Sequence, residues 1–210
     1  MRLRPCGDAA LLVELDDLAE VMVLAPALES GRASTPTITD VIPATRTILV
    51  RFDPARTSEA AVSRWIRERR SDRAAADPAS PRDRGPEVEL PVEYDGADLD
   101  KVGRITGLGR DGVVAAHTAL PWTVAFLGFA PGFAYCTGGD PRLRVPRRAT
   151  PRQRVPPGAV GLADGLTAVY PRESPGGWQL IGRTGVAVWD LEREPPALLA
   201  PGTVVRFRGA

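Results

Sequence analysis

The chain of 210 residues carries 27 basic and 26 acidic residues, so its formal net charge is +1. Hydrophobic residues make up 43% of it, which is enough apolar side chain for the core of one large domain or two small ones. A nearly neutral chain lacks the overall positive field that draws proteins to nucleic acids or anionic membranes. We therefore expect neither as a partner.

The cysteine content and the lack of targeting signals favour a cytoplasmic protein. Cys6 and Cys136 are too few for a disulfide framework and fit thiols in a reducing compartment. The first residues contain no continuous apolar stretch of the secretory type. The uncharged segment 112–139 is interrupted by His117, prolines and glycines, which argues against a membrane helix.

The first 70 residues predict a small α/β unit. The expected order is strand, helix, strand, strand, helix, with the ranges 9–15, 17–30, 38–43, 47–52 and 58–70. This order is typical of a ferredoxin-like layer, whose last strand would come from residues 87–92 or from elsewhere.

Segment 71–86 has three prolines and no periodicity, so it predicts a linker. We place the small domain at residues 1–80, linker included, and a second domain at 81–210. Two short helices are expected there at 98–105 and 110–118. Short β-runs punctuated by Gly and Pro follow, at 122–127, 159–163, 167–170, 178–182, 186–190 and 204–207. Such strands favour a closed or nearly closed β-barrel, giving an α+β chain.

Segment 126–135 alternates large residues with Gly or Ala around a Pro131-Gly132 type II turn signal. In an extended chain Phe129 and Phe133 would share one face with Leu127 and Tyr135. This pattern is compatible with barrel core. It is also compatible with an aromatic wall along which a ligand approaches the backbone.

Segment 142–154 holds six arginines and no acidic residue, and its prolines prevent a long helix. We call it the arginine arm. It could be a solvated basic loop or, less readily, bind nucleic acid, although no aromatic residue is interleaved. The third interpretation is an anion site, because guanidinium groups match carboxylate or phosphate oxygens in pairs.

Segment 174–185 opens on a Pro175-Gly176 turn signal before an alternating strand. There Gln179, Ile181 and Arg183 are expected on one face. The segment is either a simple hairpin or the polar wall of a ligand site.

His117, the only histidine, shares a predicted helix face with Val113 and Val114. It is either a packed, hydrogen-bonded core residue or the first candidate for proton transfer. The chain has no phosphate-binding Gly-x-x-x-x-Gly-Lys-Ser/Thr loop, and Lys101 is its only lysine. One histidine and two distant cysteines predict no metal site.

Several motifs together resemble one family, that of the 5-oxoprolinase B subunit, also called allophanate hydrolase subunit 1 or KipI. They are Gly7-Asp8, Tyr94-Asp95-Gly96, His117-Thr118, segment 128–135, Pro146-Arg147-Arg148, Pro151-Arg152, Tyr170-Pro171, segment 174–178 and Gly182-Arg183-Thr184. The resemblance extends over essentially the whole chain. It implies a cyclophilin-like barrel after the α/β domain. It also implies a complex with a KipA-like C subunit and an A subunit, which together open 5-oxoproline to glutamate using ATP.

Matched position by position, the resemblance implies a set of pocket residues: His117, Phe129, Pro131, Phe133, Arg148, Arg152, Gly176, Gly177, Gln179 and Arg183. On chemical grounds we expect His117 and Arg148 to be catalytic and the other eight to bind the substrate. The arginines would hold carboxylate or phosphoryl oxygens, His117 would relay a proton, and the phenylalanines would exclude water. Without a phosphate loop in this chain, ATP would be bound mainly by the partner.

Three other functions stay open from the sequence. The chain could be a KipI-like inhibitor that docks on a sensor histidine kinase. It could serve an allophanate hydrolase or urea carboxylase. Prolyl isomerisation would rest on fold analogy alone, which is weak support for an activity.

Overall fold

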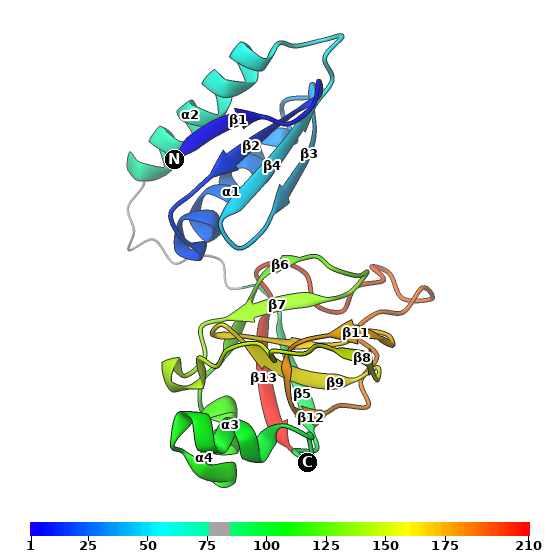
Figure 1. The fold of residues 1–210 in the computed structure, drawn as a ribbon. Coiled ribbons are helices and arrows are strands. Elements are labelled where there is room, and N and C mark those ends of the chain that lie inside the picture. Colours follow the sequence, from blue (N-terminus) through cyan, green and yellow to red (C-terminus); the bar gives the residue numbers. More distant parts are fainter. Residues whose placement is uncertain (76–84) are drawn as a thin grey trace. The chain divides into compact units, whose positions relative to one another are not determined.

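The computed structural model describes residues 1–75 and 85–210 (Figure 1). The chain divides into two compact units, Met1–Arg82 and Asp83–Ala210. The predicted boundary at residues 80 and 81 lies outside the described residues, as does most of the predicted linker. Its first five residues are helical instead, because the second helix continues to Ala75.

The N-terminal unit is a four-stranded sheet with two helices packed together on one of its faces (Figure 1). Asp17 begins the first helix, because its side chain accepts a hydrogen bond from the backbone N–H of Glu20 at 2.9 Å. The elements in chain order are β1 (Arg2–Pro5), β2 (Ala10–Glu14), α1 (Leu18–Arg32), β3 (Ile38–Pro43), β4 (Thr47–Phe52) and α2 (Glu59–Ala75).

The sheet order β1-β2-β4-β3 explains how the ferredoxin-like layer is completed. β2, β4 and β3 take the places expected for its first three strands. The place of the last strand, beside β2, is filled by β1 from the start of the chain. Residues 87–92, the alternative considered from the sequence, form a strand of the second unit instead.

The C-terminal unit is a seven-stranded sheet in the order β12-β9-β10-β7-β6-β13-β5, with a two-stranded sheet β11-β8 beside it. Its helices are α3 (Leu99–Thr106), α4 (Gly109–Ala119) and the short 3₁₀ helix η1 (Pro141–Leu143). Its strands are β5 (Glu87–Val92), β6 (Trp122–Leu127), β7 (Ala134–Thr137), β8 (Arg152–Val155), β9 (Ala159–Ala163), β10 (Leu166–Val169), β11 (Ser174–Gly176), β12 (Gln179–Arg183) and β13 (Val204–Gly209).

The seven-stranded sheet curls until its two end strands meet. Just beyond β5, Glu93 pairs with Arg183 at the end of β12, and their backbone N–H and C=O groups exchange two hydrogen bonds of 2.9 Å. This bridge nearly closes the barrel, and α3 and α4 pack against each other at one end of it (Figure 1). The predicted α+β class with a nearly closed barrel is confirmed.

Two local predictions in this unit are wrong. Residues 186–190 form no strand and make a single bridge, between Trp189 and Ala197. Pro175-Gly176 is not a turn but part of β11, which pairs with β8. Gly176 is needed there for space, because a Cβ at this position would overlap the Tyr170 hydroxyl. Among the described residues, no helix is both long enough and apolar enough to span a bilayer.

Candidate functional site

A buried carboxylate organises the two arginines that the sequence analysis singled out. Asp98 precedes α3, and its side chain is only 4% exposed. It accepts hydrogen bonds from Nη1 of Arg148 at 2.7 Å, from Nη1 and Nη2 of Arg152 at 2.7 and 3.0 Å, and from the backbone N–H of Leu180 at 2.8 Å. The three bonds from the arginines fix both guanidinium groups against one anion, and the bond from Leu180 holds that anion on the backbone of β12.

Asp98 is ionised although it is buried. Burial by itself opposes ionisation, but the hydrogen bonds from Arg152 and Leu180 and the positive charges of both arginines outweigh it, so the pKa of Asp98 lies below its ordinary value. The Arg148 and Arg152 side chains stay 27% and 21% exposed, so the cluster reaches solvent through its cations.

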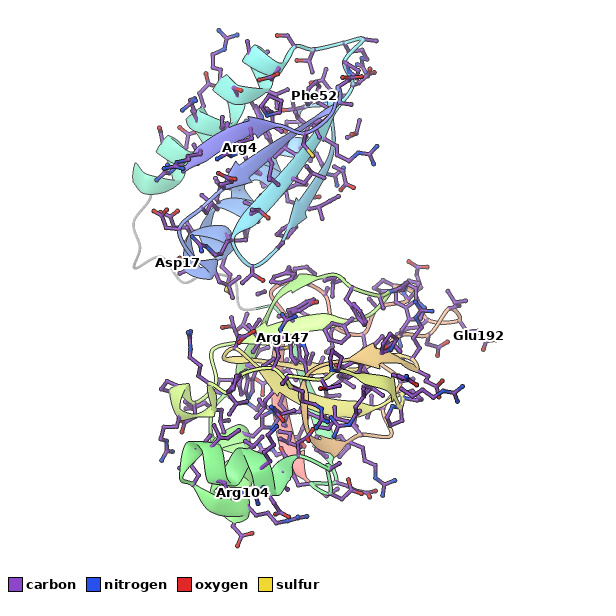
Figure 2. All side chains as sticks on the ribbon, in the orientation of Figure 1. Arg4, Asp17, Phe52, Arg104, Arg147 and Glu192 are labelled. Carbon is purple, nitrogen blue, oxygen red and sulfur yellow. The ribbon has the colours of Figure 1, made fainter. Side chains whose placement is uncertain are left out.

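The arginine arm is tied to the strand that carries Leu180. The Arg148 backbone N–H donates to the Gly177 carbonyl at 2.7 Å, and Nε2 of Gln179 donates to the Pro146 carbonyl at 2.9 Å. The Gln179 Oε1 is buried and has no hydrogen-bond partner among the described residues. Gly177, Gln179, Arg148 and Arg152 are thus brought together around Asp98. Arg147, which immediately precedes Arg148 in the arm, is labelled among the side chains of the barrel unit in Figure 2.

An aromatic cluster adjoins this arrangement through Trp178, which lies between Gly177 and Gln179. The fully buried Phe133 stands at its centre, with ring centroids 5.1 Å from Tyr170, 5.7 Å from Trp178 and 5.0 Å from Tyr135. The first two contacts are edge-to-face, the arrangement that aromatic quadrupoles favour. These four aromatic residues, which are far apart in the sequence, therefore form one continuous cluster, which we call the aromatic wall.

Phe129 lies at the open end of this wall. Its ring is 5.2 Å from that of Phe133, and the residue is 61% exposed. Its φ of +63° is in the left-handed region, which costs a residue with a Cβ about 1 kcal/mol or more. The turn after it is the predicted type II turn, confirmed by φ of +76° at Gly132 and the Phe133 N–H donating to the Ala130 carbonyl at 3.0 Å. Pro131 is exposed on this turn.

His117 is fully buried in the barrel core, which is the core role weighed from the sequence. Its Nδ1 lies 2.7 Å from the Tyr94 hydroxyl, and its Nε2 lies 3.0 Å from the hydroxyl of Thr167. Thr167 donates its own proton to the Gly161 carbonyl, so it must accept from Nε2–H, and Nδ1 is left to accept from Tyr94. The neutral imidazole is thereby satisfied, and burial lowers the pKa of His117 to about 3.

Arg183 does not join the Asp98 cluster. It is 61% exposed and pairs with Glu93 and Asp95. The expectation that it shares a face with Gln179 and Ile181 is wrong, because the register of β12 shifts between Leu180 and Gly182. Gln179 and Ile181 are buried, whereas Arg183 faces solvent.

Asp98 is the main site residue that the sequence does not reveal, since its position predicts only the start of a helix. One signal was available. Six arginines without an acidic residue among them require a partner from another segment wherever they are buried. Tyr170 packs between Phe133 and Gly176, and in the sequence it stands out only through the Tyr170-Pro171 motif.

Comparison with known proteins shows the family of this chain. The profile of the carboxyltransferase domain, subdomain C and D, matches residues 1–199. The chain belongs to this family.

Two proteins named as the B subunit of 5-oxoprolinase are similar to this chain. The one from Escherichia coli O157:H7 is 47% identical over 123 residues, and the one from Bacillus subtilis strain 168 is 44% identical over 123 residues. These matches cover 57% of this chain and 56% and 51% of the two relatives, so the chain spans about half their length. The resemblance to the 5-oxoprolinase B subunit family stated from the motifs is confirmed.

Several solved structures share this fold. The crystal structure of TTHA0988 is 36% identical with a TM-score of 0.78, covering 96% of this chain and 40% of that one. The conserved uncharacterized protein PH0987 from Pyrococcus horikoshii is 34% identical with a TM-score of 0.58, covering 100% and 97%. The K. lactis urea amidolyase, at 23% identity and a TM-score of 0.68, covers 99% of this chain and 15% of that one, and shows the shared fold alone.

Proposed function

We propose that this chain is the B subunit of an ATP-dependent 5-oxoprolinase, which opens the lactam of 5-oxoproline to glutamate together with a KipA-like C subunit and an A subunit. Identity of 44–47% to proteins named as the B subunit of 5-oxoprolinase supports the proposal. The single structural observation behind it is the arginine pair on Asp98, next to the aromatic cluster.

In this proposal the two arginines bind the substrate carboxylate. Arg148 and Arg152 are held in fixed positions by Asp98 and remain partly exposed, so they are oriented before the ligand arrives. The exposed Phe129 covers the lactam ring and excludes water, and the buried Phe133 supports the Phe129 ring from below through an edge-to-face contact. Arg183 and His117 have no direct part, because the first is neutralised elsewhere and the second is sealed in the core.

The Asp98 cluster does not match the charge of a nucleoside triphosphate. A triphosphate carries several negative charges, whereas the cluster offers one positive charge in excess. Lys101, the only lysine, lies on α3 and not on a glycine-rich loop. We therefore assign the binding of ATP to the partner chains.

The test is a substrate-dependent ATPase assay on the complex of this chain co-expressed with the A and C subunits. We expect ADP release when 5-oxoproline is added, none with urea instead, and no turnover by the chain alone. Full activity of the lone chain, or stimulation by urea only, would reject the proposal.

A matched pair of arginine variants tests the site within that complex. Arg148→Ala should lower 5-oxoproline-dependent turnover at least tenfold, which is about 1.4 kcal/mol at the transition state. Arg154→Ala is the control, since this side chain is 82% exposed and lies 3.6 Å from Glu173. Equal activity of the two variants would remove Arg148 from the site.

A further inference from the structure

The charge balance of the Asp98 cluster specifies what it can bind. One carboxylate faces two guanidinium groups, so the cluster carries a net charge of +1 in a partly buried place. Both Asp98 oxygens are fully used. Oδ1 accepts from Arg148 and Arg152, and Oδ2 accepts from Arg152 and the Leu180 N–H. The carboxylate therefore has no remaining role toward a ligand except to orient the arginines and set their charge.

The two arginines keep donors for a ligand. Arg148 uses Nη1 for Asp98 and Nε for the Thr150 carbonyl, at 3.3 Å. Arg152 uses both terminal nitrogens for Asp98. Within residues 1–75 and 85–210, Nη2 of Arg148 and Nε of Arg152 have no hydrogen-bond partner. Since each guanidinium has five N–H donors and both side chains reach solvent, these donors can serve an anion from outside.

We propose that Asp98 is a positioning residue that sets this cluster to hold one singly charged anion, a small carboxylate, in preference to a doubly charged anion such as sulfate or hydrogen phosphate. A monoanion neutralises the cluster, whereas a dianion leaves an uncompensated negative charge beside a buried carboxylate. Naming the carboxylate as that of a lactam acid rests on the proposed function. The preference for a single charge does not.

The experiment removes the charge of Asp98 and keeps the shape of the side chain, by replacing Asp98 with Asn. The 210-residue chain is titrated with acetate and with sulfate at pH 7.5 and constant ionic strength, and the arginine side-chain signals are followed by ¹H–¹⁵N NMR. The Arg148 and Arg152 signals are assigned from their lysine variants. In the unaltered chain we expect acetate to shift both signals. In Asp98→Asn, where the cluster carries +2, the ratio of sulfate to acetate affinity should rise at least tenfold.

Two further variants separate a charge effect from a general loss of structure. Asp164→Asn removes an exposed partner of Arg147, 3.1 Å away, and should change the ratio less than twofold. Arg148→Gln lowers the cluster charge to zero and should weaken acetate binding at least tenfold. This variant decides the matter if Asp98→Asn does not fold.

The proposal is overturned if the ratio of sulfate to acetate affinity is unchanged in folded Asp98→Asn. It is also overturned if the acetate affinity is unchanged in Arg148→Gln. The absence of any acetate effect on the two arginine signals in the unaltered chain also overturns it. These titrations need no partner and no turnover. An inactive complex together with the expected change in the ratio would reject the 5-oxoprolinase function and leave the anion site standing.

Discussion

The buried His117 predicts a specific loss of stability in mild acid. Its pKa is about 3 in the folded chain, against 6.5 for an ordinary histidine. The folded state keeps this imidazole neutral down to a lower pH than the unfolded state does. As the pH falls, the unfolded chain therefore takes up the proton first. The contribution of His117 to the free energy of unfolding is therefore constant above about pH 7 and falls as the pH drops below 6.5, until the folded pKa is reached.

The size of the effect follows from the two pKa values. Between pH 8 and pH 5 the loss is about 2 kcal/mol, and the full shift of about 3.5 pKa units corresponds to about 5 kcal/mol. His117 is the only histidine, so no other side chain with an ordinary pKa titrates in this window. The slope of the free energy of unfolding against pH can therefore be assigned to this one residue.

The assay combines urea unfolding of the full chain at several pH values with ¹H NMR of the single imidazole. Trp122, whose ring centroid lies 5.3 Å from that of His117, reports on the barrel unit by fluorescence. We expect the imidazole signals to keep their neutral positions down to about pH 4.5. A His117→Gln variant should be less stable overall, yet lose the dependence on pH between about 5 and 8. A flat profile in the unaltered chain, or the same slope in the variant, would refute the reasoning.

Two further predictions concern backbone positions beside the site. Gly176→Ala should lower the free energy of unfolding in urea by about 1–3 kcal/mol, since its methyl group meets the Tyr170 hydroxyl. The control Gly209→Ala places its methyl group in open space and should cost less than about 1 kcal/mol. Equal losses in the two variants would contradict this reasoning. Phe129→Asn should leave stability unchanged or raise it by up to about 1 kcal/mol, because Asn tolerates positive φ, while lowering turnover of the complex. Leu191→Asn, at an 81% exposed position, is its control, and a Phe129 variant with full turnover would exclude that ring from the site.

The sequence predicts best those strands whose apolar residues and turn signals lie within the strand and at its ends. β3, β4 and β6 have the predicted bounds, because each combines β-branched or aromatic residues with clear turn signals at its ends. β1 and β8 were missed because they are short and rich in arginine, and their pairing partners lie elsewhere in the chain. Strands of this kind are defined by the sheet they join, not by their own composition.

The candidate site shows the same limit more sharply. The motifs identified Arg148 and Arg183 on equal terms, and both pair with carboxylates in the structure. Arg148 meets a buried carboxylate fifty positions earlier and stays part of a cluster with excess positive charge. A shift in the register of β12 turns Arg183 outward to two exposed acids that neutralise it. Residue type and spacing are the same kind of signal in both cases. The difference between an anion site and a surface ion pair depends on long-range pairing, which sequence periodicity does not contain.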